Sequence, residues 1–170
     1  DAVNAMELVK MFANTLLSLD AYDKSKLPKA GATKRQVEFT AEELKEALQK
    51  LKHELISKDE ATNLFGSERG GQSVSGIVGN IFQTFGGKDL YSTVEEKAAH
   101  LLYFMVKNHP YADGNKRSGA FAFVWFLKHA GILNPARLTS EALTALTLFV
   151  AESNPKDKDK MVGLVLLLLN

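Results

Sequence analysis

The sequence has no cysteine and no excess of either charge. A chain without cysteine forms no disulfide, has no thiolate metal site and uses no cysteine nucleophile. The 21 Lys and Arg residues oppose 20 Asp and Glu residues, which gives a formal net charge of +1. This balance argues against bulk electrostatic binding to nucleic acid or to an anionic membrane, so we expect neither as a partner.

Long hydrophobic segments are also missing. The apolar run Met161–Leu169 is shorter than the about 20 residues that a transmembrane helix needs, so we expect a buried closing helix there. No N-terminal stretch has the charged-then-apolar pattern of a signal peptide. We therefore expect a cytoplasmic protein, with a translocated effector as the alternative. The chain begins at Asp1 rather than at a methionine, which fits either a processed product or an excised domain.

What is present is a globular composition with helical periodicity. A hydrophobic content of 45% in 170 residues suits one domain with a substantial core. Apolar residues at helical spacings of three and four open the chain, and a polar stretch, Asp20–Glu38, follows. The opening apolar positions are Leu8, Phe12, Leu16 and Leu19. We interpret residues 1–38 as a helix and a connection, and residues 39–170 as the main domain of the same unit.

Capping patterns predict where several further helices begin. Thr40 stands three residues before Glu43, as in a capping box, and the helix that follows has apolar positions at Leu44, Leu48, Leu51 and Leu55. The other expected helices run from near Ser57 to before Gly66, from a second capping box at Ser92 and Glu95 to Asn108–Pro110, from around Gly114 to Gly131, from Thr139, and after Pro155.

The stretch Gly66–Tyr91 contains seven glycines and does not fit a long regular helix. Its second half has the form of a small β-hairpin, with Ile81–Phe85 and Lys88–Tyr91 joined by Gly86-Gly87, although an irregular surface loop fits the pattern equally well. No dinucleotide loop or Walker P-loop is recognisable. The predicted fold class is therefore all-α, a helical bundle with one small hairpin.

Reactive and anion-binding residue types gather between two expected helices, in the segment His109-Pro110-Tyr111-Ala112-Asp113-Gly114-Asn115-Lys116-Arg117. The free N–H groups at the start of the second helix form a ready anion site, and Lys116 and Arg117 add positive charge beside it. Asp113 suits Mg²⁺, and His109 can accept a proton near neutral pH. This combination indicates phosphoryl or nucleotidyl transfer.

Each residue also has a simpler structural explanation when it is taken alone. A histidine before a proline is often a capping or surface residue, and Asp-Gly-Asn is a common turn sequence. Two cations in the first turn of a helix are slightly disfavoured by the helix dipole, and their presence makes sense where an anion binds. The segment as a whole therefore favours the functional interpretation.

The segment resembles the signature of the Fic/Doc (Fido) family, His-Pro-Phe-x-Asp/Glu-Gly-Asn-Gly/Lys-Arg, with Tyr111 in place of Phe. The resemblance, with its flanking helices, covers roughly residues 76–131. It implies a Fic/Doc-type bundle in which His109 deprotonates a Ser, Thr or Tyr hydroxyl of a target protein and Asp113 holds Mg²⁺. It further implies that Gly114 and Asn115 form an anion hole, and that Lys116 and Arg117 contact the phosphates of ATP.

The same resemblance implies that the hairpin is a flap that pairs with an extended segment of the target protein. The expected flap residues are Ile81, Phe82, Gln83, Thr84 and Phe85. Two positions bear on the group transferred: AMP-transferring members usually have Gly where this chain has Lys116, and a second Arg where it has Ala120. Both resemble the Doc branch of toxins, which phosphorylate their target, whereas Gly114 fits the broader consensus. We expect γ-phosphate transfer, with AMP transfer as the alternative.

Regulation and two competing functions complete the expectations. The only Glu at the spacing of the family's inhibitory motif is Glu96, after Ser92, and the motif is otherwise incomplete, so we expect inhibition by a partner antitoxin, by a missing N-terminal region, or not at all. One competing function is a catalytically silent module of the same fold that binds nucleotide or a partner. The other is nucleic-acid binding through Lys24–Arg35, which lacks interleaved aromatics.

Overall fold

The structure is a computed structural model that describes residue 7, residues 17–71 and residues 73–170. Of the expected opening helix, residues 17–23 are helical, and Leu19 is exposed on it. The positions Leu8, Phe12 and Leu16 lie outside the described residues.

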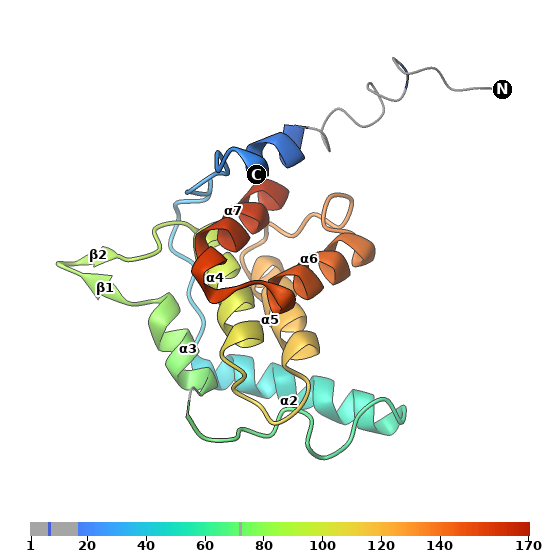
Figure 1. Ribbon diagram of the computed structural model, residues 1–170. Coiled ribbons are helices and arrows are strands. Elements are labelled where there is room, and N and C mark those ends of the chain that lie inside the picture. The colour runs from blue at the N-terminus through green and yellow to red at the C-terminus, as the bar shows by residue number, and fades with distance from the viewer. Residues whose placement is uncertain (1–6, 8–16, 72) are drawn as a thin grey trace.

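Within the described residues the chain is a helical bundle with one two-stranded antiparallel sheet, as predicted (Figure 1). The elements are α2 (Ala41–Ser57), α3 (Val74–Ile81), β1 (Thr84–Phe85), β2 (Lys88–Asp89), α4 (Val94–Lys107), α5 (Asn115–His129), α6 (Ser140–Glu152), the short 3₁₀ helix η1 (Pro155–Asp157) and α7 (Lys158–Leu169).

Side-chain caps fix the starts of α2, α3, α4 and α6. The capping box of Thr40 and Glu43 is present at α2, and Thr139 caps α6, as predicted. At α4 the prediction was displaced by one residue, because Thr93 and not Ser92 is the N-cap and its hydroxyl accepts the N–H of Glu96. Ser92 and Thr93 both carry a hydroxyl that can cap a helix, so residue type alone did not distinguish them.

Between α2 and α4 one prediction was wrong, and one short helix was not predicted. No helix runs from Ser57 to Gly66, because α2 continues through Ser57 and turns follow it. Conversely, α3 forms across Gly76 and Gly79, which the sequence interpretation treated as helix breakers. A cap at Ser73 and a buried face offset the glycines; this face consists of Val74, Ile77, Val78 and Ile81, spaced as one side of a helix.

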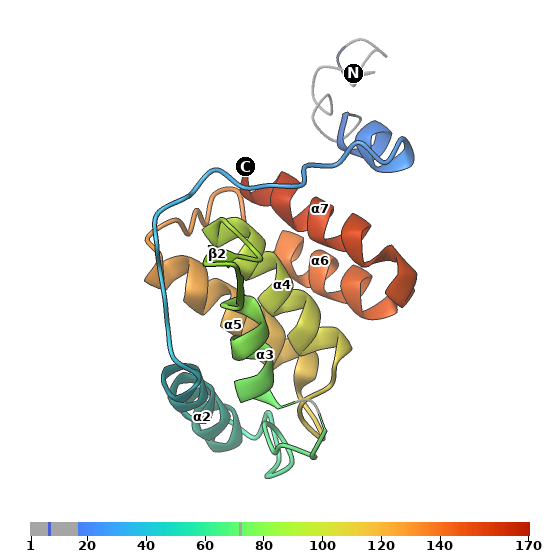
Figure 2. The ribbon, with the colours of Figure 1, turned by 90° about the vertical axis from the view of Figure 1, so that its left-hand side faces the viewer.

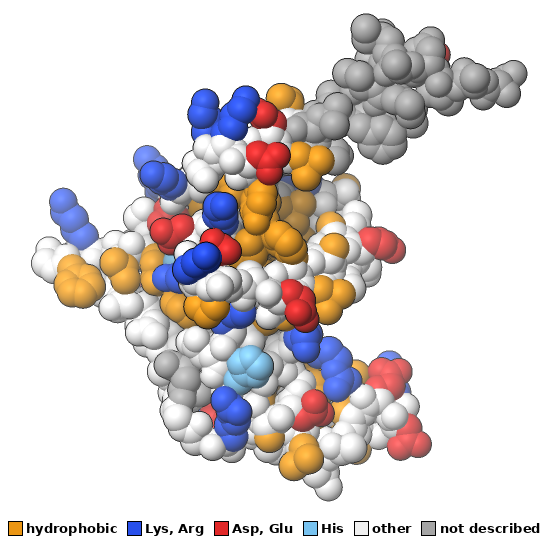
Figure 3. Space-filling view, in the orientation of Figure 1, with side chains coloured by type: hydrophobic (Ala, Val, Ile, Leu, Met, Phe, Trp, Pro, Cys, Tyr) orange, Lys and Arg blue, Asp and Glu red, His pale blue; other side chains and the backbone are white. Residues whose placement is uncertain are grey.

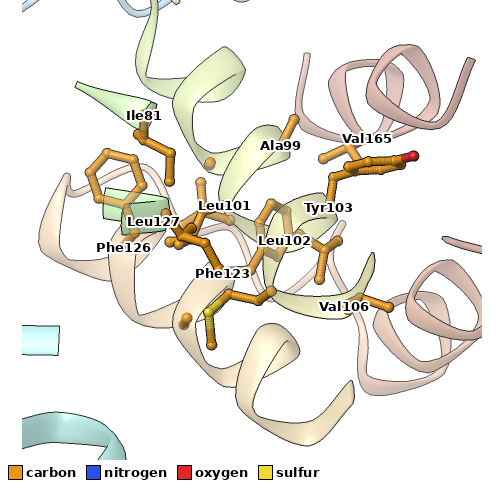
Figure 4. Close-up of a cluster of buried hydrophobic side chains, with 14 of the residues drawn as sticks. Ile81, Ala99, Leu101, Leu102, Tyr103, Val106, Phe123, Phe126, Leu127 and Val165 are labelled. Atoms are coloured by element: carbon orange, nitrogen blue, oxygen red, sulfur yellow. The ribbon is translucent and has the colours of Figure 1, made fainter. Parts of the chain in front are cut away.

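The central helix is α4, which packs against α3, α5, α6 and α7. Eleven of its 14 residues are buried, so it presents apolar side chains in nearly every direction. Figure 4 shows Leu101 and Leu102 of α4 beside Phe123 and Leu127 of α5. Because four helices pack against α4, the positions of its two ends are well determined.

Residues 24–39 run along the outside of the bundle from the first helix to α2, as Figures 1 and 2 both show. The buried carboxylate of Glu95 attaches this connection to α4: it accepts the backbone N–H of Thr33 at 2.9 Å and the Thr33 hydroxyl at 2.8 Å. Arg35 donates to the carbonyl of Ala130. Two members of the polar stretch thus bind protein groups directly.

The hairpin is confirmed, but it is shorter than predicted. Thr84–Phe85 pairs with Lys88–Asp89 around Gly86-Gly87, and both turn glycines have positive φ. Ile81 is the buried last residue of α3 and Phe82 is its C-cap, so neither belongs to a strand. The base of the hairpin is attached to the first turn of α4, where the buried ammonium of Lys97 lies 3.0 Å from the carboxylate of Asp89 and also donates to Tyr91 O.

The surface carries mixed charge. On the face shown in Figure 3, basic side chains are interspersed with acidic ones, and hydrophobic side chains are exposed near α6 and α7. Leu148 and Phe149 of α6 are about half exposed. No helix in the described part of the chain is long and apolar enough to cross a membrane.

Candidate active site

The segment singled out in the sequence is the loop that joins the C-terminus of α4 to the N-terminus of α5. His109 stands in this loop with φ of 49°, a left-handed backbone conformation that costs a non-glycine residue about 1–2 kcal/mol. Its side chain is exposed and makes no hydrogen bond to any described residue. A strained, unpartnered and accessible histidine is free to react with a ligand.

The loop is closed by the side chain of Asn115. Its Oδ1 accepts the N–H of Tyr111 at 3.0 Å, and its Nδ2 donates to the carbonyl of Tyr111 at 2.9 Å. Tyr111 is itself buried, and desolvation, followed by the nearby charge of Glu68, raises its pKa to about 12. The amide of Asn115 therefore holds the loop, and what the residue offers an anion is its backbone N–H.

A second segment, Phe65–Arg69, runs beside the loop and braces it. Gly66 N–H donates to Asp113 O at 3.1 Å, Ala112 N–H donates to Ser67 O at 2.9 Å, and Arg69 N–H donates to Pro110 O at 3.2 Å. Isolated β-bridges join Phe65 to Asp113 and Glu68 to Tyr111. No sequence pattern predicts this pairing, because its partners lie more than 40 residues apart.

Gly114 is required at the start of α5 for two reasons. Its φ is 86°, and a Cβ at this position would overlap the ring of buried Phe65. It is the N-cap of α5 and has no side chain to satisfy the first N–H groups. The helix therefore begins with N–H donors that are open to an external anion.

A cavity of about 390 Å³ opens at this helix terminus. It is lined by Val106, His109, Ala112, Asp113, Gly114, Asn115, Lys116, Arg117, Ala151 and Glu152. The structure thus brings together every residue expected to act in catalysis, phosphate binding and metal binding. The volume lies within the range of about 300–1,000 Å³ that is typical of small-molecule sites.

A comparison with protein-family models places this geometry among known proteins. The model of the Fic/DOC family matches residues 38–127, just over half of the chain. The chain belongs to the Fic/Doc family. The matched region runs from the residues before α2 to the last part of α5 and includes the whole loop. No curated protein and no solved structure matches the chain. Fic/Doc proteins are generally transferases.

The two cations of the Fic/Doc loop differ in their surroundings. Lys116 is exposed, and no carboxylate in the described part of the chain lies within ion-pair distance of it. Arg117 donates from Nη1 to the carbonyl of Glu60 at 2.8 Å, and its guanidinium lies 4.7 Å from the centre of the Phe65 ring. Its other N–H groups remain for a ligand.

Asp113 is exposed at the mouth of the cavity, with its carbonyl fixed by Gly66. Among residues 7, 17–71 and 73–170, no three His, Asp or Glu side chains gather as a metal site. A single carboxylate nevertheless suits Mg²⁺, which usually takes one or two carboxylates and completes its shell with waters and substrate phosphates.

Sequence reasoning missed the wall that α6 contributes. Ala151 and Glu152 line the cavity although they lie outside the family match. Lys107, at the end of α4, holds this wall by donating to Ala151 O at 3.2 Å and to Ser153 O at 2.6 Å. No local sequence pattern predicts this contact, which joins the C-termini of α4 and α6.

The hairpin residues do not join the site. Asp89 is anchored at Lys97 in the first turn of α4, whereas His109 follows the last turn. The 14 residues of α4 span about 21 Å, and Figures 1 and 2 show the hairpin and the loop at opposite ends of this helix. The structure therefore separates Ile81, Phe82, Gln83, Thr84 and Phe85 from His109.

Proposed function

We propose that this protein transfers a phosphate-containing group from ATP to a Ser, Thr or Tyr hydroxyl of a target protein. The observation that carries the proposal is the single cavity in which an accessible histidine faces an uncapped helix N-terminus and two cations. Proton acceptance and phosphate binding are both needed for transfer to a hydroxyl, and they are adjacent here.

His109 accepts the proton of the attacking hydroxyl in this scheme. The hydroxyl oxygen forms a new bond to a phosphorus of ATP, the bond from that phosphorus to the leaving phosphate oxygen breaks, and the proton remains on the imidazole. The exposure of His109 and its lack of a partner among the described residues support this role. His109 also lines the cavity at the start of α5.

The phosphates are bound by the start of α5. The N–H groups at Asn115 and Lys116 and the positive end of the helix dipole attract them, and the Lys116 ammonium adds a full charge. Arg117 contributes the N–H groups that Glu60 leaves free. Asp113 would hold Mg²⁺, which neutralises phosphate charge when it is bound.

Lys116 and Ala120 favour γ-phosphate transfer over AMP transfer, by their resemblance to the Doc branch. The test is to incubate the protein and a cell lysate with ATP labelled at either the γ or the α phosphorus. Protein labelling from the γ position alone supports the kinase, whereas labelling from the α position shows AMP transfer and contradicts it. If Lys116 decides which phosphorus of ATP faces His109, the variant Lys116→Gly should shift labelling from the γ toward the α position.

The target is proposed to approach as an extended segment beside Phe65–Arg69. This segment already pairs with the loop through one edge, and it lies next to Asp113 and Tyr111, whereas the Thr84–Asp89 hairpin lies at the other end of α4. Added-strand binding would place the target hydroxyl near His109. Substituting Glu68 with Pro should reduce labelling of the target without reducing ATP binding.

Inhibition is proposed to come from a separate antitoxin protein. Glu96, the residue at inhibitory spacing, accepts hydrogen bonds from the hydroxyls of Ser92 and Thr93 at the start of α4, one helix length from the cavity. It is therefore engaged as a cap. A protein of this design would act as a toxin or an effector in the cell.

The contacts of Arg117 with Glu60 and Phe65 favour a second candidate, a silent module that binds nucleotide without turnover. If neither label is transferred and His109→Ala matches the wild type, the transferase proposal is wrong. Retained ATP binding in that experiment would support the module.

A further inference from the structure

A second cavity, of about 710 Å³, lies at the other end of α4 and shares no lining residue with the cavity around His109. Its walls are the connection from Ser25 to Lys29, the two residues that follow β2, the first half of α4 and the start of α7. None of these elements is explained by the transfer of a phosphate-containing group at His109.

His100 lines this cavity and is only 7% exposed. Its Nδ1 lies 2.7 Å from the carbonyl of Glu96, and since a carbonyl only accepts, Nδ1 carries the proton. The ring is further fixed by stacking on Tyr91, at 3.7 Å between centroids and an interplanar angle of 18°. Burial lowers the pKa of His100 to about 4, so the ring is neutral at physiological pH.

The remaining nitrogen of His100, Nε2, therefore presents a lone pair. It has no hydrogen-bond partner among the described residues. Nε2 is nevertheless partly accessible. In the described part of the chain, the one side-chain nitrogen or oxygen that is both fully buried and without a hydrogen-bond partner is Ser118 Oγ. An unpartnered acceptor on a largely buried ring that lines a cavity is suited to a ligand that donates a hydrogen bond.

Positive charge also lines this cavity. Lys29, Lys158 and Lys160 line the cavity, and none of them forms an ion pair with a described carboxylate. The ammonium of Lys158 lies 5.2 Å from the centre of the Phe104 ring, and that of Lys160 lies 5.2 Å from the Tyr22 ring.

Two carboxylates also line the cavity, but they leave the positive charge in excess. Glu96 is engaged by the Ser92 and Thr93 hydroxyls, and Asp159 is exposed. The cavity thus has three cations against two anions, of which one already serves as a cap. A phosphate monoester carries about −1.5 to −2 at pH 7 and has three acceptor oxygens, so it can accept from all three ammonium groups at once, which a carboxylate with two oxygens cannot.

We propose that this cavity binds a small phosphate monoester that carries a free hydroxyl group. The phosphate lies between the ammonium groups of Lys29, Lys158 and Lys160, and the hydroxyl donates a hydrogen bond to His100 Nε2. The lysines supply charge and the histidine supplies selectivity for a hydroxyl-bearing ligand, since an unprotonated nitrogen has nothing to offer a bare phosphate oxygen.

The test uses the full chain at pH 8, with ribose 5-phosphate as the probe; the comparison ligands are ribose and methyl phosphate, whose dianion carries no hydroxyl. The protein has four histidines, so the ring C–H signals can be followed individually by NMR and assigned by substitution. We expect ribose 5-phosphate to shift the His100 signal saturably, at lower concentration than either comparison ligand. The His109 signal reports separately on phosphate entering the other cavity.

Variants of the lysines make the test specific. Lys158→Gln and Lys160→Gln should each weaken binding about tenfold, the effect of losing one charge-assisted hydrogen bond. Lys156→Gln is the matched control, because Lys156 is exposed nearby and does not line the cavity, and it should bind like the wild type. His100→Phe keeps an aromatic ring against Tyr91 and should bind ribose 5-phosphate no better than methyl phosphate.

Three results would overturn the proposal. The first is a His100 signal that does not move at millimolar ribose 5-phosphate. The second is equal affinity for ribose 5-phosphate and methyl phosphate, which would remove the role of the hydroxyl and of Nε2. The third is equal weakening by Lys158→Gln and Lys156→Gln, which would show general charge attraction. If His100→Phe does not fold, the lysine variants decide.

Discussion

The two ends of α4 each place a histidine at a cavity, and the two histidines are built in opposite ways. His109, beyond the C-terminus, is exposed, has a strained backbone and makes no hydrogen bond to a described residue. His100, in the first half of the helix, is buried, stacked on Tyr91 and bonded to Glu96. An accessible ring can gain and lose a proton during a reaction, whereas a buried, desolvated ring stays neutral and serves as a fixed acceptor.

The largest effect that we expect comes from removing the accessible histidine. His109→Ala should lower the rate of label transfer from ATP about 10²–10⁴-fold, because the attacking hydroxyl loses its base. The free energy of unfolding should change little, since the side chain is exposed. His53→Ala, another exposed histidine, is the control, and transfer by it should equal the wild type. Equal rates for the two variants would remove His109 from the chemistry.

Much of the end of α4 around His109 could be predicted from the sequence, because its residues are consecutive. Local chemistry alone predicts a helix N-terminus with an anion site at Gly114, Asn115 and Lys116. The brace by Phe65–Arg69 and the wall from Ala151–Glu152 could not be predicted, since both depend on contacts between segments far apart in the chain.

The end around His100 was missed for a related reason. Nothing next to His100 in sequence marks it as special, and in a helix of apolar residues it looks like an ordinary buried position. Its surroundings come from Tyr91, from the connection and from α7, which only the fold brings together. The helix α3 was not predicted for a different reason. Its glycines suggested irregular structure, although Val74, Ile77 and Ile81 have the spacing of one helix face.

The next effect tests why the loop at His109 needs glycine. Gly114→Ala should lower the free energy of unfolding by about 3 kcal/mol, because the alanine is strained at positive φ and its Cβ overlaps Phe65. Gly70→Ala is a matched control, with φ of 81° and nothing within 4 Å of the added Cβ, and should lose only about 1 kcal/mol. Urea denaturation measures both. Equal losses would mean that the Phe65 contact is unimportant.

A smaller effect concerns the pH dependence at the other end of α4. The pKa of His100 is lowered from 6.5 to about 4 in the folded protein, so the unfolded chain binds the extra proton first as the pH falls. The stabilisation is therefore complete above pH 6.5 and is lost as the pH falls toward 4. Between pH 7 and pH 5 the free energy of unfolding should fall by about 2 kcal/mol from this group.

Urea denaturation at pH 7 and at pH 5 measures this loss, and the comparison is with His100→Phe, which cannot titrate. The difference between wild type and variant should depend on pH, whereas His53→Gln should follow the wild type. A wild type and a His100→Phe variant whose stabilities fall in parallel would show that His100 is not held neutral by burial.

The smallest effect sharpens the electrostatics of the cavity at His109. Glu152 adds a negative charge to a wall of the site where phosphates are proposed to bind. Glu152→Gln should therefore tighten ATP binding about two- to fivefold, the size expected for one exposed charge, and the gain should shrink as salt is added. Glu141→Gln, at the other end of α6, is the control, and its affinity for ATP should equal that of the wild type. Weaker binding by Glu152→Gln would reverse the assignment, because the carboxylate would then be holding the ligand, through a hydroxyl or a metal ion, and not repelling it.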